Sequence, residues 1–426
     1  MSLAVSILAR RETLAEAVDA LAERYWNNEP VEDLVSGLTE TFDTLIIDLW
    51  RQHFNDTSGC ALFAVGGYGR AELHPGSDID ILVLAEKPQR HRETIEAFLR
   101  DLFDLNVEVG HSVRDIKTCV KECRGDITVA TALFERRFLT GDASLIAPLD
   151  KALQHRKIWP IEDFFIAKRD EQVARHRHYD NVDYNLEPNI KTSPGGLRDI
   201  HTTLWVCNRQ FGTTDIEELV RLEVLTDIEA RWLRDGMRFL WWVRYGLHTL
   251  AGRKEDQLHF ARQRELSQRL GFMDTESKSA VELFMQHYYR HVMALSEVND
   301  IILQYFQEDI VAKKKPTMEP LNERFRLVNR RIDVVQPDIF LKNPSAMLEM
   351  FLLMAQREEN IRVRVTAIRA LRDAVHLIDE EFRRNPENCR LFLRILKAPY
   401  TVVTQLTRMR RYGVLGRYLP AFGDIV

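Results

Sequence analysis

The sequence predicts an α+β protein in which a small mixed-sheet domain precedes a longer, mostly α-helical part. Two observations lead to this fold class. Short apolar runs at 61–65, 79–84 and 105–109 alternate with glycine- and proline-containing turns, as the strands of an α/β unit do. From about residue 128 onward the apolar residues recur at helical spacing, and glycine and proline are sparse outside 188–196.

Bulk composition is that of a globular protein with several domains. A chain of 426 residues is too long for one ordinary core. The formal net charge of -5 argues against a protein that wraps nucleic acid. No apolar run approaches the roughly 20 residues of a membrane span, so no membrane partner is expected. The odd number of cysteines, 5, without a CxxC pair, predicts reduced thiols in a cytoplasmic protein.

Two helices are expected before the sheet. The first is predicted over 3–28, because apolar side chains recur there at helical spacing and Pro30 follows. The second is predicted over 34–52. We assign both helices to an N-terminal segment, residues 1–54.

Residues 55–145 form the predicted mixed-sheet domain. An apolar strand runs into Gly66 and Gly67, where a short helix can begin. A Pro-Gly turn follows, and a second apolar strand then opens with the residues 77–80. The third strand is expected at 105–109, after a helix.

Asp78 and Asp80 are the first two candidate metal ligands. Residues i and i+2 of a strand face the same side, so both carboxylates project from one face of the sheet. Two carboxylates this close repel each other unless a cation lies between them, and hard oxygen ligands select Mg²⁺. Gly66 and Gly67 lack Cβ atoms, so a phosphate can approach the backbone N–H groups at the helix start. Each signal is weak alone, but together they favour magnesium-dependent nucleotidyl transfer.

This segment resembles the DNA polymerase β-type nucleotidyltransferase superfamily. That family's pattern is a GG or GS pair, about ten residues, two acids that alternate with apolar residues, and a third acid on a later strand. Here 68–77 separate Gly67 from Asp78, which fits the pattern. The resemblance implies a polymerase β-type fold for the mixed-sheet domain. It also implies that Asp78, Asp80 and a third acid are catalytic and hold two Mg²⁺ ions.

Glu108 is the best candidate for the third acid. It lies between two valines, as an acid on a strand should. Asp101 and Asp104 are nearby competitors, but they fall in the helical stretch 95–104.

Arg70, Ser77 and His111 have a functional and a plain structural explanation each. Arg70 either neutralises phosphate charge or forms a surface salt bridge with Glu72. Ser77 either bonds a phosphate or caps its turn, and the turn role is favoured. His111 is better explained as a core histidine than as a catalyst. We keep Arg70 and Ser77 as candidate nucleotide-binding residues.

A second cluster lies at 189–201. Two glycines followed by Arg198 and Asp199 at a helix start have a plain structural explanation, a loop and the cap of the helix. Lys191 and Arg198 beside such a glycine pair can also bind phosphate. We favour Lys191 and Arg198 as nucleotide-binding residues.

The wider chain resembles a narrower family, the bacterial bifunctional PII uridylyltransferase/uridylyl-removing enzymes (GlnD). The segments that carry the likeness are 66–84, 108–114, 126–132, 189–201, 321–325 and 413–423. The resemblance implies that UMP passes from UTP to a tyrosine hydroxyl of the PII signal protein, with release of pyrophosphate, in nitrogen regulation. We expect a helical domain of that family over 146–311, a linker over 312–320 and a helical segment over 321–426.

Family members continue into an HD phosphohydrolase domain and ACT domains. None of the 13 histidines here is followed by aspartate. The resemblance therefore implies that this chain is the N-terminal portion, without the uridylyl-removing and glutamine-sensing domains, so that glutamine acts only on the full-length protein.

Two other functions stay open. One is an adenylyltransferase that acts on glutamine synthetase, because a related motif and the same fold occur there and the acidic site does not reveal the base. The other is a catalytically silent nucleotide-binding scaffold.

Overall fold

The computed structural model describes residues 3–54, 59–153, 158–179, 185–311 and 316–423. They form two compact units, Met1–Asn299 and Asp300–Val426, which are described one at a time. Part of the predicted linker, 312–315, lies outside the described residues. Among the helices that the structure does describe, none has the length and apolar character needed to cross a lipid bilayer.

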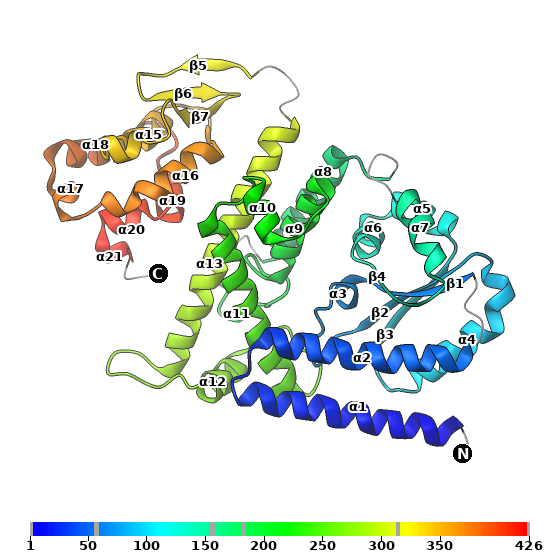
Figure 1. Cartoon of the computed structure of the whole chain (residues 1–426). Helices are drawn as coiled ribbons and strands as arrows, with labels where there is room; N and C mark the ends of the chain where they lie inside the picture. Colours follow the sequence, from blue (N-terminus) through cyan, green and yellow to red (C-terminus); the bar gives the residue numbers. More distant parts are fainter. Residues whose placement is uncertain (1–2, 55–58, 154–157, 180–184, 312–315, 424–426) are drawn as a thin grey trace. The chain divides into compact units, whose positions relative to one another are not determined.

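The first unit begins with two long helices that lie side by side, α1 (Leu3–Trp26) and α2 (Val31–His53) (Figure 1). Both predicted helices are therefore present. The first turn of α2 carries two acids and its last turn carries two bases, a distribution that complements the helix dipole. Trp50 of α2 is fully buried and stacks on Phe54 with ring centroids 3.8 Å apart.

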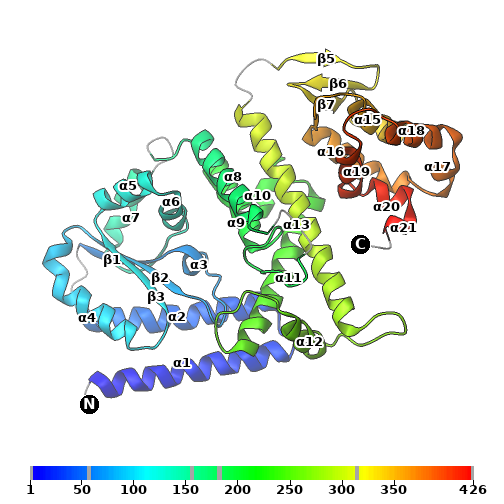
Figure 2. The ribbon, with the colours of Figure 1, turned by 180° about the vertical axis from the view of Figure 1, so that it is seen from behind.

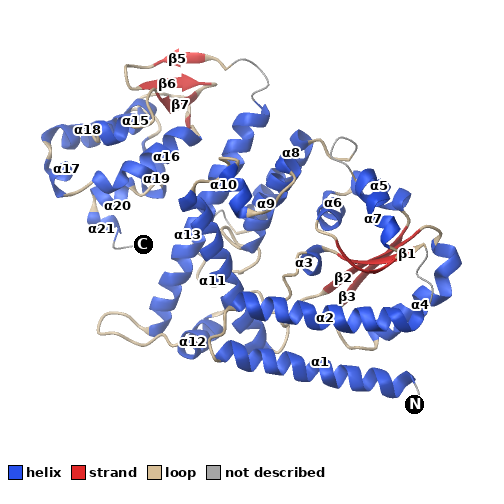
Figure 3. Ribbon diagram, in the orientation of Figure 1, coloured by secondary structure: helices blue, strands red, loops and turns tan. Residues whose placement is uncertain are grey.

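The predicted mixed sheet is present in the first unit, with the strand order β3-β2-β1-β4 (Figure 3). Its strands are β1 (Cys60–Ala64), β2 (Ile79–Ala85), β3 (Val109–Arg114) and β4 (Arg137–Gly141). β1 pairs antiparallel with β2 and with β4, whereas β2 and β3 run parallel. This α+β arrangement, followed by helices, confirms the predicted fold class.

The third strand begins later than predicted. The sequence predicts a strand at 105–109, but α4 (Arg92–Phe103) ends just before Leu105, and β3 begins only at Val109. Asn106 has a φ of 60°, so the chain turns there. The apolar residues 105 and 107 belong to this turn.

Helices lie on both sides of this sheet (Figure 2), and alternate residues of the strands belong to two different cores. Ile81 and Val83 face the core shared with α2 and α4. Leu82 and Leu84 face the opposite core, to which α5 (Ile116–Gly125), α6 (Ile127–Phe134) and α7 (Ile146–Ala152) contribute. Asp80 therefore shares its face of β2 with Leu82. A single helical turn, α3 (Gly66–Gly69), follows β1, and the 3₁₀ turns are η1 (Pro88–His91) and η2 (Ala143–Leu145).

The rest of the first unit is helical. Its helices are α8 (Ile161–Arg177), α9 (Leu197–Phe211), α10 (Ile216–Arg221), α11 (Asp227–Ala251), α12 (Phe260–Arg269) and the first part of α13 (Ala280–Val311). A capping box of Thr226 and Glu229 begins α11, and Gly252 ends it with a φ of 62°.

The second unit contains a sheet as well as helices. The sequence predicts a linker over 312–320 and a helical segment over 321–426, but this part of the chain contains four short strands, in the order β5-β6-β7-β8. They are β5 (Met318–Pro320), β6 (Phe325–Val328), β7 (Arg331–Val334) and β8 (Arg362–Val363). β5 falls in the predicted linker, and the other three strands fall within 321–426. Asn329 and Arg330, with φ of 50° and 61°, form the two-residue hairpin turn between β6 and β7.

Helices make up the remainder of this unit. They are α14 (Ile339–Lys342), α15 (Ala346–Ala355), α16 (Val365–Ala374), α17 (Glu380–Arg384), α18 (Pro386–Leu396), α19 (Val402–Arg411), α20 (Val414–Tyr418) and α21 (Pro420–Gly423), with the 3₁₀ turn η4 (Val375–Leu377). The fully buried helix residues Met350, Phe351 and Leu371 share one core with Phe325 of the sheet.

Candidate functional site

The three predicted acids meet at one edge of the first sheet. Asp78 precedes β2, Asp80 is its second residue, and Glu108 precedes β3. Because the two strands are parallel with Ile79 opposite Val109, Glu108 lies level with Asp78. The carbonyl of Glu108 accepts the N–H of Ile79 at 2.8 Å.

The competing acids lie elsewhere. Asp101 is buried on α4 and bonds His53 with 2.8 Å between Nε2 and Oδ2. Asp104 is the exposed residue that ends α4. Both belong to α4 or its end, whereas Glu108 lies beside the start of β2, so Glu108 is the acid that the fold brings to this edge.

The charges of the three acids influence one another. Burial and the neighbouring charge of Asp78 raise the pKa of Asp80. The close carboxylate of Asp78 also raises the pKa of the exposed Glu108. Burial acts to raise the pKa of Asp78 itself, but the ammonium of Lys254 and the other polar neighbours outweigh it and lower this pKa. The charged forms of Asp80 and Glu108 are therefore disfavoured at this edge, whereas that of Asp78 is stabilised by Lys254.

Two glycines leave room for the carboxylate of Asp80. A Cβ on Gly66, which has a φ of 59°, would lie 3.4 Å from Oδ2 of Asp80. A Cβ on Gly110 of β3 would lie 2.1 Å from Oδ1, which is far inside van der Waals contact. A side chain at 110 would therefore displace this carboxylate.

A cavity of about 420 Å³ lies beside the acids. Small-molecule sites commonly have volumes of roughly 300–1,000 Å³. Its wall includes all the residues predicted to bind nucleotide, which are Gly66, Gly67, Arg70, Ser77, Lys191 and Arg198. Asp78 and Asp80 also line it, whereas Glu108 lies outside its wall. Further cations of the wall are Lys168, Arg175, Arg244 and Lys254.

Arg70 and Ser77 both have partners within the protein. Nε of Arg70 donates to Glu72 at 2.7 Å and Nη1 donates to Glu135 at 2.8 Å. The predicted pairing with Glu72 thus exists, but with only 21% of the Arg70 side chain exposed it is no surface salt bridge. Oγ of Ser77 accepts the N–H of His74 at 2.9 Å, which is the favoured turn role.

Lys191 and Arg198 bring positive charge into the cavity wall. Burial, together with the nearby cations Arg244 and Arg198, lowers the pKa of Lys191 to about 8. Burial and the charge of Arg70 lower the pKa of Arg198, whose guanidinium lies 5.4 Å from the centroid of Trp205. An anion in the cavity would relieve the repulsion among these cations.

The glycines and the aspartate of the second cluster fix the loop that carries Lys191 and the first turn of α9, which carries Arg198. A Cβ on Gly195 would lie 2.5 Å from the carbonyl oxygen of Val292, and one on Gly196 would lie 2.7 Å from that of Ile190. Close backbone packing thus accounts for both glycines. Asp199 is buried and accepts from Arg175 and from the N–H of Gly195, each at 2.7 Å.

His111 does not match the preferred explanation from the sequence. It is an exposed residue of β3, and its ring packs edge-on against Phe103 with centroids 5.4 Å apart. It is therefore not a core histidine, because β3 is an edge strand of the sheet.

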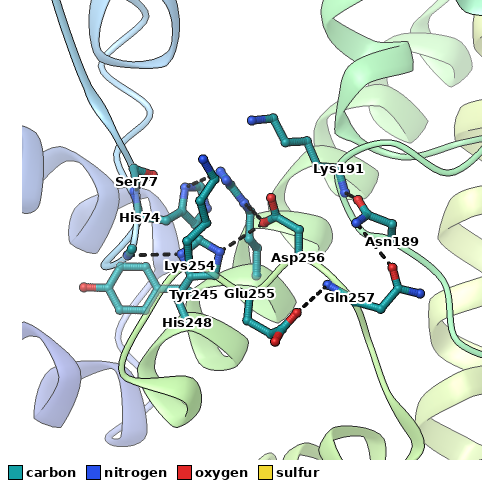
Figure 4. Close-up of polar contacts among 12 residues, drawn as sticks. His74, Ser77, Asn189, Lys191, Tyr245, His248, Lys254, Glu255, Asp256 and Gln257 are labelled. Atoms are coloured by element: carbon teal, nitrogen blue, oxygen red, sulfur yellow. Dashed lines mark hydrogen bonds and ion pairs between the residues drawn. The ribbon is translucent and has the colours of Figure 1, made fainter. Parts of the chain in front are cut away.

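Sequence reasoning missed a third group of residues, which lies in the last turns of α11 and in the loop after it (Figure 4). Nζ of Lys254 donates to Oδ2 of Asp78. The carboxylate of Asp256 accepts from Nε of Arg244 at 2.7 Å and from Nε2 of His248 at 3.0 Å. Nδ1 of His248 in turn accepts the N–H of Gly76 at 3.1 Å. The one local signal in the sequence is Gly252, a glycine of the kind that ends a helix. It does not indicate which residues the following loop contacts.

The acids are not gathered as a finished metal centre. Within the described ranges, no three His, Cys, Asp or Glu side chains lie close enough together to hold an ion. Here the ammonium of Lys254 stands beside Asp78. Oδ1 of Asp78 is buried and accepts no hydrogen bond from any residue that the structure describes.

Three family models match successive parts of the chain. Residues 46–139 match the nucleotidyltransferase domain, 163–303 match the GlnD PII-uridylyltransferase, and 325–418 match the uridylyltransferase GlnD third domain. The resemblance to both families stated from the sequence is thereby confirmed.

Curated relatives agree with these matches. Bifunctional uridylyltransferase/uridylyl-removing enzymes of Pseudomonas aeruginosa (strain LESB58) and Pseudomonas putida (strain GB-1) are each 45% identical over 424 residues. The one from Ectopseudomonas mendocina (strain ymp) is 43% identical over the same length. The alignments cover 99% of this chain and 47% of each relative, so the chain spans about half the length of the curated relatives it matches.

Proposed function

We propose that this chain, a nucleotidyltransferase by its domains, is a uridylyltransferase that moves UMP from UTP to a tyrosine hydroxyl of a PII signal protein and releases pyrophosphate. The GlnD-type domains and the names of the relatives support this substrate and this acceptor. The observation that carries the proposal is the placement of Asp78, Asp80 and Glu108 at the same end of β2 and β3, beside a cavity whose wall includes Lys191 and Arg198.

Two Mg²⁺ ions belong to this proposal, held by Asp78, Asp80 and Glu108. The residues fit such ions, because a buried carboxylate oxygen of Asp78 has no hydrogen-bond partner among the described residues. Burial and the charge of Asp78 raise the pKa of Asp80, and the close carboxylate of Asp78 raises that of Glu108, so a cation at these acids would favour their charged forms. When bound, magnesium would neutralise phosphate charge and lower the pKa of a coordinated hydroxyl.

The residues of the chain itself would position both substrates. Lys191 and Arg198 bind the phosphates of UTP from the cavity wall, and Gly66 and Gly67 allow them to approach the backbone. Ser77 holds the turn before Asp78 through the N–H of His74. Arg70, already bound to two glutamates, acts mainly by shaping the wall.

Glu108 is suited to receive the proton of the acceptor. A free tyrosine has a pKa of about 10, so its hydroxyl needs a base near neutral pH. Glu108 is exposed, where an incoming tyrosine can reach it, and its pKa is raised by Asp78. The phenolic oxygen bonds to the α-phosphorus, the bond to pyrophosphate breaks, and the proton passes to Glu108.

The proposal also includes where the protein acts. We place it in the cytoplasm, where its five free cysteines stay reduced and UTP and PII meet. Neither a nucleic acid nor a membrane is a partner in this proposal.

A competition assay tests the choice of nucleotide and acceptor. The chain is incubated with Mg²⁺, labelled UTP and purified PII, and unlabelled UTP or ATP is added in excess. We expect PII to become labelled. Excess unlabelled UTP should prevent this labelling, and excess ATP should not. Labelling from ATP, with glutamine synthetase as the acceptor, would show an adenylyltransferase instead. Tight UTP binding without any transfer would show a silent scaffold.

A further inference from the structure

A lysine from the helical part of the first unit reaches the acidic edge of the sheet. The loop between α11 and α12, residues 252–259, carries Lys254, whose Nζ donates to Oδ2 of Asp78 across 176 positions of sequence. Lys254 and Asp78 both line the cavity that contains Lys191 and Arg198. This lysine therefore has the acids on one side and the proposed phosphate site on the other.

The backbone of the 252–259 loop is fixed on two sides (Figure 4). A Cβ on Gly76 would lie 2.3 Å from the backbone nitrogen of Lys254, so the loop packs directly on the turn before Asp78. The N–H of Ile190 donates to the carbonyl of Asp256 at 2.8 Å, which attaches the loop to the segment of Lys191.

Buried side chains strengthen both attachments. His248 is fully buried and links Gly76 to the carboxylate of Asp256. Arg244 donates to the same carboxylate. The loop backbone thus stays in place, whereas 37% of the Lys254 side chain is exposed. A lysine has a flexible four-carbon stem, so its ammonium can change partners while the backbone remains fixed.

The ammonium of Lys254 occupies the carboxylate oxygen of Asp78 that a metal ion would also use. With Lys254 at Oδ2, Asp78 is balanced by a cation of the protein. An ion bound to Asp78 would repel that ammonium, and the nearest large source of negative charge is then a triphosphate in the cavity. Lys191 and Arg198 would bind the same phosphates from another part of the wall.

We propose that Lys254 is a further nucleotide-binding residue, which balances Asp78 in the nucleotide-free site and moves to the phosphates when a divalent ion replaces it at Asp78. This inference rests on the proposed function, because it takes Asp78 as a metal ligand and the cavity as the triphosphate site.

The variant Lys254→Gln is expected to change two affinities in opposite directions. Without nucleotide, a divalent ion no longer competes with an ammonium at Asp78 and binds about two- to fivefold more tightly, the scale of a partly exposed ion pair. UTP loses a charge-assisted hydrogen bond and binds about tenfold more weakly. A residue that only supports the fold would weaken both.

The experiment uses Mn²⁺ in place of Mg²⁺, because electron paramagnetic resonance measures the concentration of free Mn²⁺. Mn²⁺ affinity without nucleotide and UTP affinity with the ion are measured on the 426-residue chain and its variants. Arg253→Gln is the matched control, since Arg253 is the adjacent residue, has 76% of its side chain exposed and lies outside the cavity wall. We expect it to behave as the wild type. Lys254→Arg keeps the charge and is expected to keep most of the UTP affinity.

An unchanged Mn²⁺ affinity in Lys254→Gln contradicts the inference, whatever happens to UTP. Weaker binding of both ligands also contradicts it, because that result marks a structural role. If the wild type fails to modify PII while Lys254→Gln still shows the two opposite changes, the proposed acceptor is wrong and the inference stands. If the wild type modifies PII and the variant changes neither affinity, the inference is wrong and the proposed function stands.

Discussion

At the scale of single residues, the sequence indicated the acids more readily than the cations. The i, i+2 spacing of Asp78 and Asp80 at the start of a strand is a local pattern, so their closeness could be predicted. Lys254 contacts Asp78 from 176 positions away, in a loop whose charges look like those of any solvated helix end. No local period or motif encodes that contact, because it depends on how α11 packs beside the sheet.

Asp80→Asn should abolish transfer and slightly stabilise the protein. Burial and the charge of Asp78 raise the pKa of Asp80, so the charged form is disfavoured in the folded state. The amide removes that charge, and the free energy of unfolding at neutral pH should rise. Transfer should fall about a thousandfold or more, because a metal ligand is lost. Chemical denaturation measures the change in stability, and a transfer assay measures the loss of activity. Near-normal turnover would contradict the assignment of Asp80 as a metal ligand.

Glu108→Gln should lower kcat far more than it weakens UTP binding. Glu108 lies outside the cavity wall, on the side that an acceptor can reach, so its loss affects proton transfer before it affects the nucleotide. We expect kcat to fall about a hundredfold or more. Asp104→Asn is the matched control, as an exposed acid at the end of α4. Damage in the control with a harmless Glu108→Gln would show that the wrong third acid was chosen.

At the scale of elements, the existence of β1, β2 and β3 was predictable from their apolar runs, whereas the bounds of β3 and the existence of the other strands were not. The apolar run at 105–109 predicted a strand, but the positive φ of Asn106 places its first residues in a turn. The hairpin of β6 and β7 was missed because its turn is Asn329-Arg330, without the glycine that usually marks such turns. Its strands have only four residues each, which is too short for a clear period of two.

Gly110→Ala should disturb the site through the pairing of β2 with β3. The new Cβ of residue 110 would lie 2.1 Å from Oδ1 of Asp80, so the two atoms would overlap. We expect a stability loss of about 1–3 kcal/mol and a loss of transfer about as large as for Asp80→Asn. Gly125→Ala is the control, because nothing lies within 4 Å of its added Cβ. Thermal unfolding and the transfer assay compare the two, and equal activities would mean that Asp80 is not held in this position.

His248 should make the stability of the first unit pH-dependent. Burial, followed by the charge of Arg244, outweighs the bond to Asp256 and lowers the pKa of His248 below 6.5. As the pH falls, the histidine therefore takes up its proton at a higher pH in the unfolded protein than in the folded one. The free energy of unfolding should then decrease below about pH 6.5. His248→Gln should lack that component. Denaturation at several pH values measures it, and identical pH profiles for both proteins would contradict a neutral His248.

At the scale of the whole molecule, the proposed activity rests on the acidic end of β2 and β3 in the first unit. We expect the 426-residue chain to transfer UMP but not to remove it, and added glutamine to change neither. Hydrolysis of an HD type needs clustered histidine and aspartate ligands, and none of the 13 histidines is followed by aspartate. Purified PII-UMP is given to the chain with and without glutamine, and steady release of UMP would place the removing activity in these residues.

The most direct test of the central claim is the mass of intact PII after incubation with this chain, UTP and Mg²⁺. The Asp78–Asp80–Glu108 edge and its cavity predict a PII subunit heavier by one UMP, with the added group on a tyrosine. Asp80→Asn, which should remain folded, is expected to leave PII unmodified. An unmodified PII with the wild-type chain, or the same modification with Asp80→Asn, would contradict the account.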